Sequence, residues 1–193
     1  MDADAFLRNI SDKDTIQEHL TFMALYIALY ENFTSTFVDR VMGFLCTPYL
    51  EDGKMKYKET PVYREKIKNR VVDHKGNKDV RKATMLWLKE EGAMSQQDYS
   101  DFLSIKSIRN SYAHEMARII LEGVPPDDIQ WFSRLLDLYG KVDKWWINQI
   151  EIPTSGACLP GSYEEDGVAN LMLCAFSSVI KSLYLNEDMN QSG

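Results

Sequence analysis

Residues 15–45 have the sequence TIQEHLTFMALYIALYENFTSTFVDRVMGFL, and this stretch decides the fold. Asp14 or Thr15 can cap its start, and Pro48 lies just past its end. Between these limits, apolar residues recur at steps of three and four, the period of one buried helical face. They are Ile16, Leu20, Met23, Ile27, Tyr30, Phe37, Val41 and Phe44. The stretch therefore predicts a single long helix.

Further helix signals divide the rest of the chain. Thr60 before Pro61 is an N-cap followed by proline at the first helical position, and Ser95 with Asp98 resembles a capping box. Helices are expected over about 61–72, 78–91, 96–122, 127–150 and 162–183, with a loop over 152–161 and with Ser162 and Glu165 at capping-box spacing ahead of the last helix. We expect an all-α, up-and-down bundle of five or six helices in a single domain, residues 1–193. A short hairpin or ordered loop would occupy 47–60, with Asp52-Gly53 as its turn, and the tail 187–193 would fray.

Composition excludes several classes of protein. Apolar residues make up 45% of the chain and charged residues 26%, which excludes disordered and collagen-like proteins. The three cysteines are too far apart for a zinc site or a disulfide framework, which favours a reduced environment: Cys46, Cys158 and Cys174. The acidic N-terminus is unlike a signal peptide, and the longest apolar run is well short of the roughly 20 residues that span a bilayer. We therefore expect a soluble, cytoplasmic protein with no membrane contact.

The charge is unevenly distributed. The net charge is −7, yet residues 54–89 contain twelve Lys and Arg against four Asp and Glu. Such a basic segment, with Tyr57 and Tyr63 interleaved, is typical either of a surface for a phosphate-bearing partner or of a solvated helical face. The candidate residues for binding RNA or a protein partner are Lys54, Lys56, Lys58, Arg64, Lys66, Lys68 and Arg70.

The helix expected over 96–122 carries three kinds of surface. At about 100° per residue, Phe102, Ile105 and Tyr112 belong to a core stripe that extends to Ile108, Ala113, Met116, Ile119 and Ile120. Serines and charged residues form a solvent face. Between the two runs a narrow mixed strip, which suits contact with a second subunit: Leu103, Asn110, His114, Ala117 and Leu121.

Within this helix, Arg109-Asn110-Ser-Tyr-Ala-His114 resembles the RNxxxH, or Rx4–6H, motif of HEPN domains. The resemblance implies a homodimer with the two motifs facing each other. It also implies an endoribonuclease that needs no metal or cofactor, often the toxin of a toxin–antitoxin or phage-defence system. An acidic antitoxin could then occupy the basic segment as readily as RNA. A subgroup of the family has a tyrosine two residues after the histidine; Met116 stands there, so control through that tyrosine is not expected.

The residue types suit this chemistry independently. Histidine titrates near neutral pH and can transfer protons, while arginine matches phosphate oxygens and stabilises added negative charge. We therefore expect His114 to act as acid or base, Arg109 to stabilise the transition state, and Asn110 to orient either the imidazole or the phosphate. The alternative is a structural Arg109 paired with a buried carboxylate, in a non-catalytic dimeric module that regulates a partner protein.

Other candidate residues have simpler explanations. His19 and His74 lack partners at metal-ligand spacing, and neither phosphate-binding glycine motif is present. Trp145 and Trp146 are about 100° apart on a helix, so both cannot be fully buried against one surface. One of them is expected to cover a partner interface or to stack on a base, although core packing remains open for the pair.

Overall fold

The computed structural model describes residues 12–72, 75–156 and 170–180, and in these it is predominantly helical, which confirms the all-α class. The chain divides into two compact units, residues 1–123 and 124–193, which are described separately. The first unit contains α2 (Lys13–Leu45), β1 (Thr47–Glu51), β2 (Lys54–Lys58), α3 (Pro61–Tyr63), the π-helical turn η1 (Arg64–Lys68), α4 (Val80–Glu90), α5 (Gln96–His114) and α6 (Met116–Glu122). The second contains α7 (Asp127–Trp146), the π-helical turn η2 (Ile147–Glu151), α8 (Ile152–Ser155) and α9 (Leu171–Ile180).

Helix α2 is the long helix that the apolar period predicts. The cap is Asp12 and not Asp14 or Thr15 as expected, because the Asp12 carboxylate accepts from the backbone N–H of Asp14 at 3.0 Å. Its buried residues include four of the predicted positions, whereas Leu20 and Phe44 are 39 and 46% exposed. The buried side chains are Phe22, Met23, Tyr26, Leu29, Tyr30, Phe33, Thr34, Phe37 and Val41.

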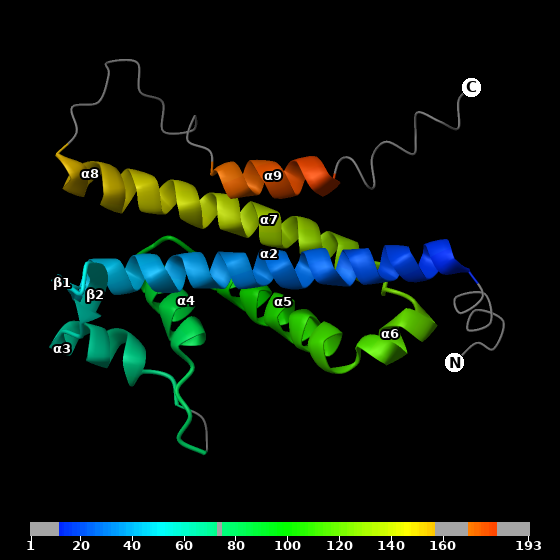
Figure 1. Cartoon of the computed structure of the whole chain (residues 1–193), viewed down its shortest axis with the longest axis horizontal. Helices are drawn as coiled ribbons and strands as arrows, with labels where there is room; N and C mark the ends of the chain where they lie inside the picture. Colours follow the sequence, from blue (N-terminus) through cyan, green and yellow to red (C-terminus); the bar gives the residue numbers. More distant parts are fainter. Residues whose placement is uncertain (1–11, 73–74, 157–169, 181–193) are drawn as a thin grey trace. The chain divides into compact units, whose positions relative to one another are not determined.

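Aromatic side chains hold α5 against α2. The ring of Tyr112 lies edge-on to Tyr26, with centroids 5.2 Å apart, and Phe102 stacks on Tyr30 at 6.1 Å. Such pairs add to the stabilisation from burial alone. Figure 1 shows α4, α5 and α6 following one side of α2. The rotation of α5 about its own axis is therefore fixed by its core stripe.

Residues 47–58 form the hairpin rather than the loop. Asp52 and Gly53, with φ of 53° and 71°, make the tight turn, and β1 pairs antiparallel with β2. The hairpin leads into α3, where Thr60 caps the helix by accepting from the N–H of Tyr63 at 3.1 Å. The same hydroxyl donates to the carbonyl of Leu45 at 2.6 Å, so it ties α3 to the end of α2.

The helix expected over 96–122 is interrupted. The capping box of Ser95 and Asp98 starts α5 as predicted, but α5 ends at His114. Glu115 leaves helical geometry at φ −121° and ψ 20°, and α6 begins after it. Arg118 ion-pairs with Glu115 and with Glu122, which stabilises the short helix locally.

The second unit is built on α7. Helical structure continues through η2 into α8, where a loop was expected from residue 152. Pro153 lies in the first turn of α8, where its missing N–H is tolerated, and the wider π turn precedes it. The amide of Asn170 donates to Asp143 at 3.2 Å and links the start of α9 to α7.

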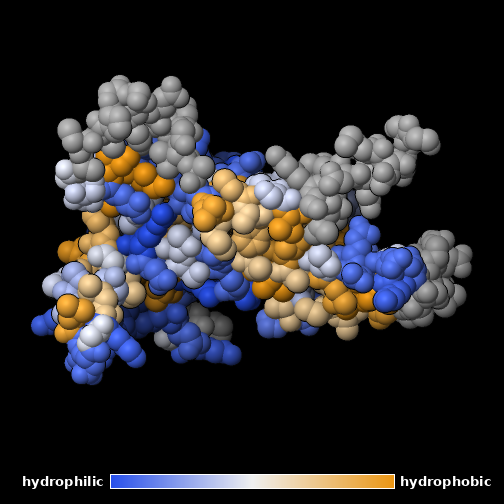
Figure 2. Space-filling model, turned by 45° about the horizontal axis from the view of Figure 1, so that its top comes forward, coloured by the Kyte–Doolittle hydropathy of each residue, from blue (hydrophilic) through white to orange (hydrophobic). Residues whose placement is uncertain are grey.

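Helix α9 has an apolar outer surface. Leu171, Met172 and Val179 are 83, 46 and 42% exposed, and Figure 2 shows hydrophobic residues gathered over this helix. Only residues 170–180 of the helix expected over 162–183 are described, and its predicted capping residues, Ser162 and Glu165, lie outside the described residues, as does the tail 187–193. Among the described helices, none combines the length and the apolarity that crossing a membrane requires.

Candidate functional site

Arg109 lies where α5 borders α2. The core stripe turns Ile105 and Tyr112 into the first unit, so Arg109 comes to the edge of the contact beside Tyr30. Its guanidinium carbon lies 5.8 Å from the centroid of the Tyr30 ring, within cation–π range. Burial raises the pKa of Tyr30 to about 12, so its hydroxyl stays protonated at neutral pH. The Arg109 side chain is 25% exposed.

The guanidinium of Arg109 makes two polar contacts. One terminal nitrogen donates to the Glu31 carboxylate of α2, and the other donates to Oδ1 of Asn110 at 3.2 Å. The Nε atom is buried and has no hydrogen-bond partner among the described residues. The structure therefore joins two of the three predicted motif residues and adds a carboxylate that the motif does not contain.

Glu31 serves two arginines. Its second oxygen lies 2.7 Å from a terminal nitrogen of Arg81, near the start of α4. Two guanidinium groups sharing one carboxylate leave a local surplus of one positive charge. Sequence analysis missed both Glu31 and Arg81, because no spacing along the chain connects positions 31, 81 and 109. The only signal was the place of Glu31, directly after an apolar run.

A neighbouring ion pair is formed by Asp79 and Lys106. Asp79 caps α4 by accepting from the N–H of Lys82 at 2.9 Å, and Lys106 of α5 donates to its other oxygen at 2.5 Å. Partial burial raises the pKa of Asp79, but these hydrogen bonds outweigh that effect and hold the pKa below the ordinary value of 3.8. Asp79 is therefore ionised at neutral pH.

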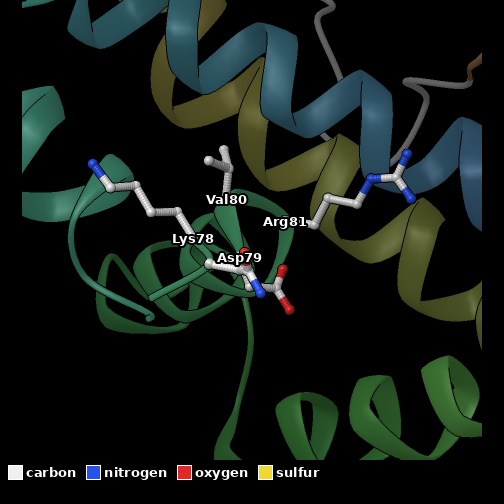
Figure 3. Close-up of a pocket in the computed structure, with 5 residues that line it drawn as sticks. Lys78, Asp79, Val80 and Arg81 are labelled. Carbon is white, nitrogen blue, oxygen red and sulfur yellow. The ribbon is translucent and has the colours of Figure 1, made fainter. Parts of the chain in front are cut away.

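A shallow cavity of about 480 Å³ lies at the start of α4. Figure 3 shows the Lys78 and Arg81 side chains extending away from each other, with the Asp79 carboxylate on a third side. Arg81 thus belongs both to this cavity and to the cluster around Arg109. The lining residues are Asn77, Lys78, Asp79, Val80 and Arg81.

His114 lies at the last position of α5, not in the interior of a long helix as expected. Its side chain is exposed. On an α-helix, a residue five positions after Arg109 is displaced by about 140° around the axis and about 7.5 Å along it. The arginine and histidine of one chain therefore point in different directions. The break at Glu115 is what brings His114 to a helix end.

The predicted partner strip is also divided by this break. Leu103 lies on α5 and is 36% exposed, whereas Ala117 and Leu121 lie on α6. Ala117 is exposed and Leu121 is half-buried. Ala113, at the end of α5, and Met116, at the start of α6, were expected in the core stripe but are exposed, and for Met116 the reason is the break at Glu115 that separates α6 from α5.

The predicted RNA-binding or partner-binding residues fall into two groups. Four of the seven form ion pairs within the chain: Lys56 with Glu51, Arg64 and Lys68 with Glu59, and Arg70 with Glu90. The side-chain hydrogen bonds from Lys68 and Arg70 lower the pKa of Glu59 and Glu90 respectively. The other three have no ion pair with another described residue: Lys54, Lys58 and Lys66.

The aromatic residues singled out in the sequence differ in their exposure. Tyr63, which is interleaved among the basic residues in the sequence, is only 7% exposed, so its ring is not available to a partner. It is buried because α3 turns it inward. Trp146 is 3% exposed and Trp145 is half-buried, which confirms that the pair is not fully buried together.

Among the described residues, the cysteine and histidine side chains outside the motif form no second cluster. Cys46 is buried, which raises the pKa of its thiol, and Cys174 is exposed. Cys158 and His74 lie outside the described residues. Over residues 12–72, 75–156 and 170–180, no three His, Cys, Asp or Glu side chains converge on a point that could hold a metal ion.

No family model, curated protein or solved structure matches this chain. The candidate chemistry therefore rests on the motif residues and their surroundings. Those surroundings are a surface-edge arginine joined to Asn110, Glu31 and Arg81, with an exposed histidine one and a half helical turns further on.

Proposed function

We propose that this chain is a metal-independent endoribonuclease of the HEPN type, a toxin or phage-defence component of the cytoplasm. The observation that carries the proposal is the contact of Arg109 with Asn110 at the accessible edge of α5, with an exposed His114 in the same motif. The His114 side chain is exposed and that of Arg109 is 25% exposed, so we propose that a phosphodiester approaches the motif from this edge.

The proposed reaction uses the nucleophile that RNA carries itself. A histidine takes the proton of the 2′-hydroxyl, and the 2′-oxygen attacks the adjacent phosphorus. The bond from phosphorus to the 5′-oxygen breaks, and that oxygen receives a proton. Arg109 stabilises the negative charge that accumulates on the phosphoryl oxygens. The products are a 2′,3′-cyclic phosphate and a 5′-hydroxyl.

A homodimer would supply the second proton-transfer group. One imidazole cannot act as base and acid at the same moment, and Arg109 and His114 of one chain diverge by helical spacing. Two-fold symmetry presents the same surface patch from both copies, so two motifs facing each other would place an arginine and a histidine from each copy around one phosphate. We propose the strip of Leu103, Ala117 and Leu121 as part of that interface.

RNA would approach over the basic segment. The proposed contacts are the residues without an ion pair, Lys54, Lys58 and Lys66, together with paired cations whose exposed carboxylate partners a phosphate can replace. An acidic antitoxin would compete for the same surface, because surface ion pairs of this kind contribute little and exchange readily.

One observation favours a second candidate function. The ion pair of Arg109 with Glu31, which Arg81 shares, is what a structural arginine would form. In that case the chain is a non-catalytic helical module of the same fold, which dimerises and regulates a partner protein. The two candidates differ in whether Arg109 and His114 are needed for cleavage.

The deciding experiment is cleavage of total RNA in the presence of EDTA. We expect wild-type protein to cut RNA and leave cyclic phosphate ends, and His114→Ala and Arg109→Ala to lose at least a hundred-fold in rate, about what general acid–base catalysis contributes. His19→Ala removes the same group on α2 and should keep the activity. Equal cleavage by wild type and His114→Ala, or none by either, would overturn the enzyme proposal.

A further inference from the structure

The hairpin presents two chemically different faces. Residues opposite each other in an antiparallel pair lie on the same face, and alternate residues of a strand share a face. The pairs Thr47 with Lys58, Tyr49 with Lys56 and Glu51 with Lys54 therefore form one side, called here the lysine face. The other side consists of Pro48, Leu50, Met55 and Tyr57.

Both faces of the hairpin are exposed, with Leu50 and Met55 on the opposite face at 72 and 57%, and the lysine face lies away from α2. On the opposite face, the hydroxyl oxygen of Tyr57 lies 3.7 Å from where a Cβ atom on Gly43 of α2 would be, so that face turns toward α2. All ten strand residues are exposed, and Tyr49 retains 42% of its surface. The hairpin lies beside the C-terminal end of α2 (Figure 1). Its lysine face therefore points into solvent.

The charges on this face favour an anionic ligand. Glu51 is its only carboxylate and is paired with Lys56, so Lys54 and Lys58 leave two positive charges without an ion pair among the described residues. Alternate residues of a strand are about 6.8 Å apart. This separation is similar to that of successive phosphates on an extended RNA strand.

We infer that the lysine face binds single-stranded RNA, with Lys54, Lys56 and Lys58 along the phosphates and Tyr49 stacked on a base. The choice of RNA rests on the proposed function. Interleaved cations and an exposed aromatic ring are what a single strand requires, because its bases are free to stack and its backbone is charged. Tyr49 supplies the exposed ring on this face, whereas Tyr57 lies on the opposite face and Tyr63 is buried.

An acidic protein is the less suitable occupant of the same face. Protein interfaces have an apolar core, and the apolar residues of the hairpin other than Tyr49 lie on the opposite side. A duplex is unsuitable as well, because its stacked bases are not available to Tyr49. Single-stranded RNA uses both the charge and the ring.

The test is binding of a short fluorescein-labelled oligouridylate to the full chain, measured by fluorescence anisotropy over a series of salt concentrations. The His114→Ala background prevents cleavage during the measurement. In that background, Lys58→Gln should weaken binding about five-fold and flatten the dependence of log Kd on log salt by about 0.7. Tyr49→Ala should weaken binding about ten-fold, and Tyr49→Phe, which keeps the ring, should bind like the parent.

Lys13→Gln is the matched control, because it removes one exposed lysine at the far end of α2. Equal affinities for Lys58→Gln and Lys13→Gln, or for Tyr49→Ala and Tyr49→Phe, would overturn the inference, as would an affinity without salt dependence. Binding through the lysine face by a protein that never cuts RNA would refute the nuclease proposal alone. If the wild-type chain cleaves RNA but Lys58→Gln and Tyr49→Ala bind the oligouridylate like the parent, this inference alone is refuted.

Discussion

Glu31 is the residue whose role depends most on its surroundings. It lies on the half-buried edge of α2 and holds Arg81 and Arg109, which belong to two other helices. A carboxylate between two guanidinium groups offsets their mutual repulsion and uses several of their N–H groups. It also sets the direction in which Arg109 points, so it is a positioning residue for the proposed reaction.

We expect Glu31→Gln to lower the free energy of unfolding by about 1 kcal/mol, because the partly buried Arg109 and the exposed Arg81 lose their shared charge. Urea denaturation followed by circular dichroism would measure this. Glu51→Gln is the matched control, since it breaks an exposed pair with Lys56 and should cost less than about 0.5 kcal/mol. Equal losses in the free energy of unfolding for the two substitutions would show that the ion pairs of Glu31 stabilise the chain no more than an exposed pair does.

The lowered pKa of Asp79 should make the stability of the chain depend on pH. Its pKa is lower in the folded chain than the ordinary value, so its contribution to stability is present at neutral pH and is lost as the pH falls below about 4. We expect Asp79→Asn to be less stable than wild type by about 1 kcal/mol at pH 7 and the difference to shrink at pH 3. Asparagine can still cap α4, so the comparison isolates the ion pair with Lys106.

Urea denaturation at both pH values measures this difference. Asp137→Asn is the control, because it removes an exposed carboxylate on α7 and should change stability little at either pH. A difference between wild type and Asp79→Asn that stays constant from pH 7 to pH 3 would contradict the prediction.

Among the elements, α5 has the best-defined start. Ser95 accepts from the N–H of Asp98 at 3.0 Å, and the buried carboxylate of Asp98 accepts from the N–H of Ser95 at 2.6 Å. Each side chain satisfies a backbone donor that the helix itself leaves open. The capping box therefore fixes the first turn of the helix that carries the motif.

We expect Ser95→Ala to reduce the free energy of unfolding by about 1 kcal/mol, the usual effect of losing an N-cap. Thermal unfolding would show a fall in Tm of about 2–4 °C for a chain of this size. Ser100→Ala, at an exposed position inside the same helix, should change Tm little or raise it slightly. A Ser95→Ala variant as stable as Ser100→Ala would mean that the cap does not stabilise α5.

At the scale of the whole molecule, the charge is segregated. A net charge of −7 coexists with the basic segment 54–89, where Lys56, Arg64, Lys68, Arg70 and Arg81 form ion pairs with carboxylates in the chain. An anionic partner must compete with these contacts at the five paired cations, whereas Lys54, Lys58 and Lys66 have no ion pair with a described residue. The expectation of one domain for residues 1–193 stays a prediction beside the two compact units.

We expect the full chain to be a dimer at micromolar concentration, as measured by size-exclusion chromatography with light scattering. Leu103→Glu should shift the chain toward monomer and reduce RNA cleavage together, because it places a charge in the proposed strip. Leu50→Glu, which charges a 72% exposed leucine of the hairpin, should leave the mass unchanged. A wild-type chain that is monomeric under these conditions would refute the composite site.

Local sequence determined much of the fold, because caps, turns and apolar periods act over a few residues. The period of α2, the caps at Thr60 and Ser95, and the Asp52-Gly53 turn were all predicted from neighbouring positions and are confirmed. The break after His114 was not predicted, since residues 103–121 keep a helical period through it. Helical period alone cannot reveal where a helix changes direction.

The surroundings of the motif were decided only by the tertiary structure. The sequence identified Arg109, Asn110 and His114, yet the approach of Glu31 and Arg81 required three helices to pack. The lysine face differs, because the two-residue Asp52-Gly53 turn sets the register that pairs Tyr49 with Lys56, and only the placement of the hairpin against α2 is tertiary. Contacts between residues far apart in the chain depend on which faces are buried, and burial is a property of the packed elements together.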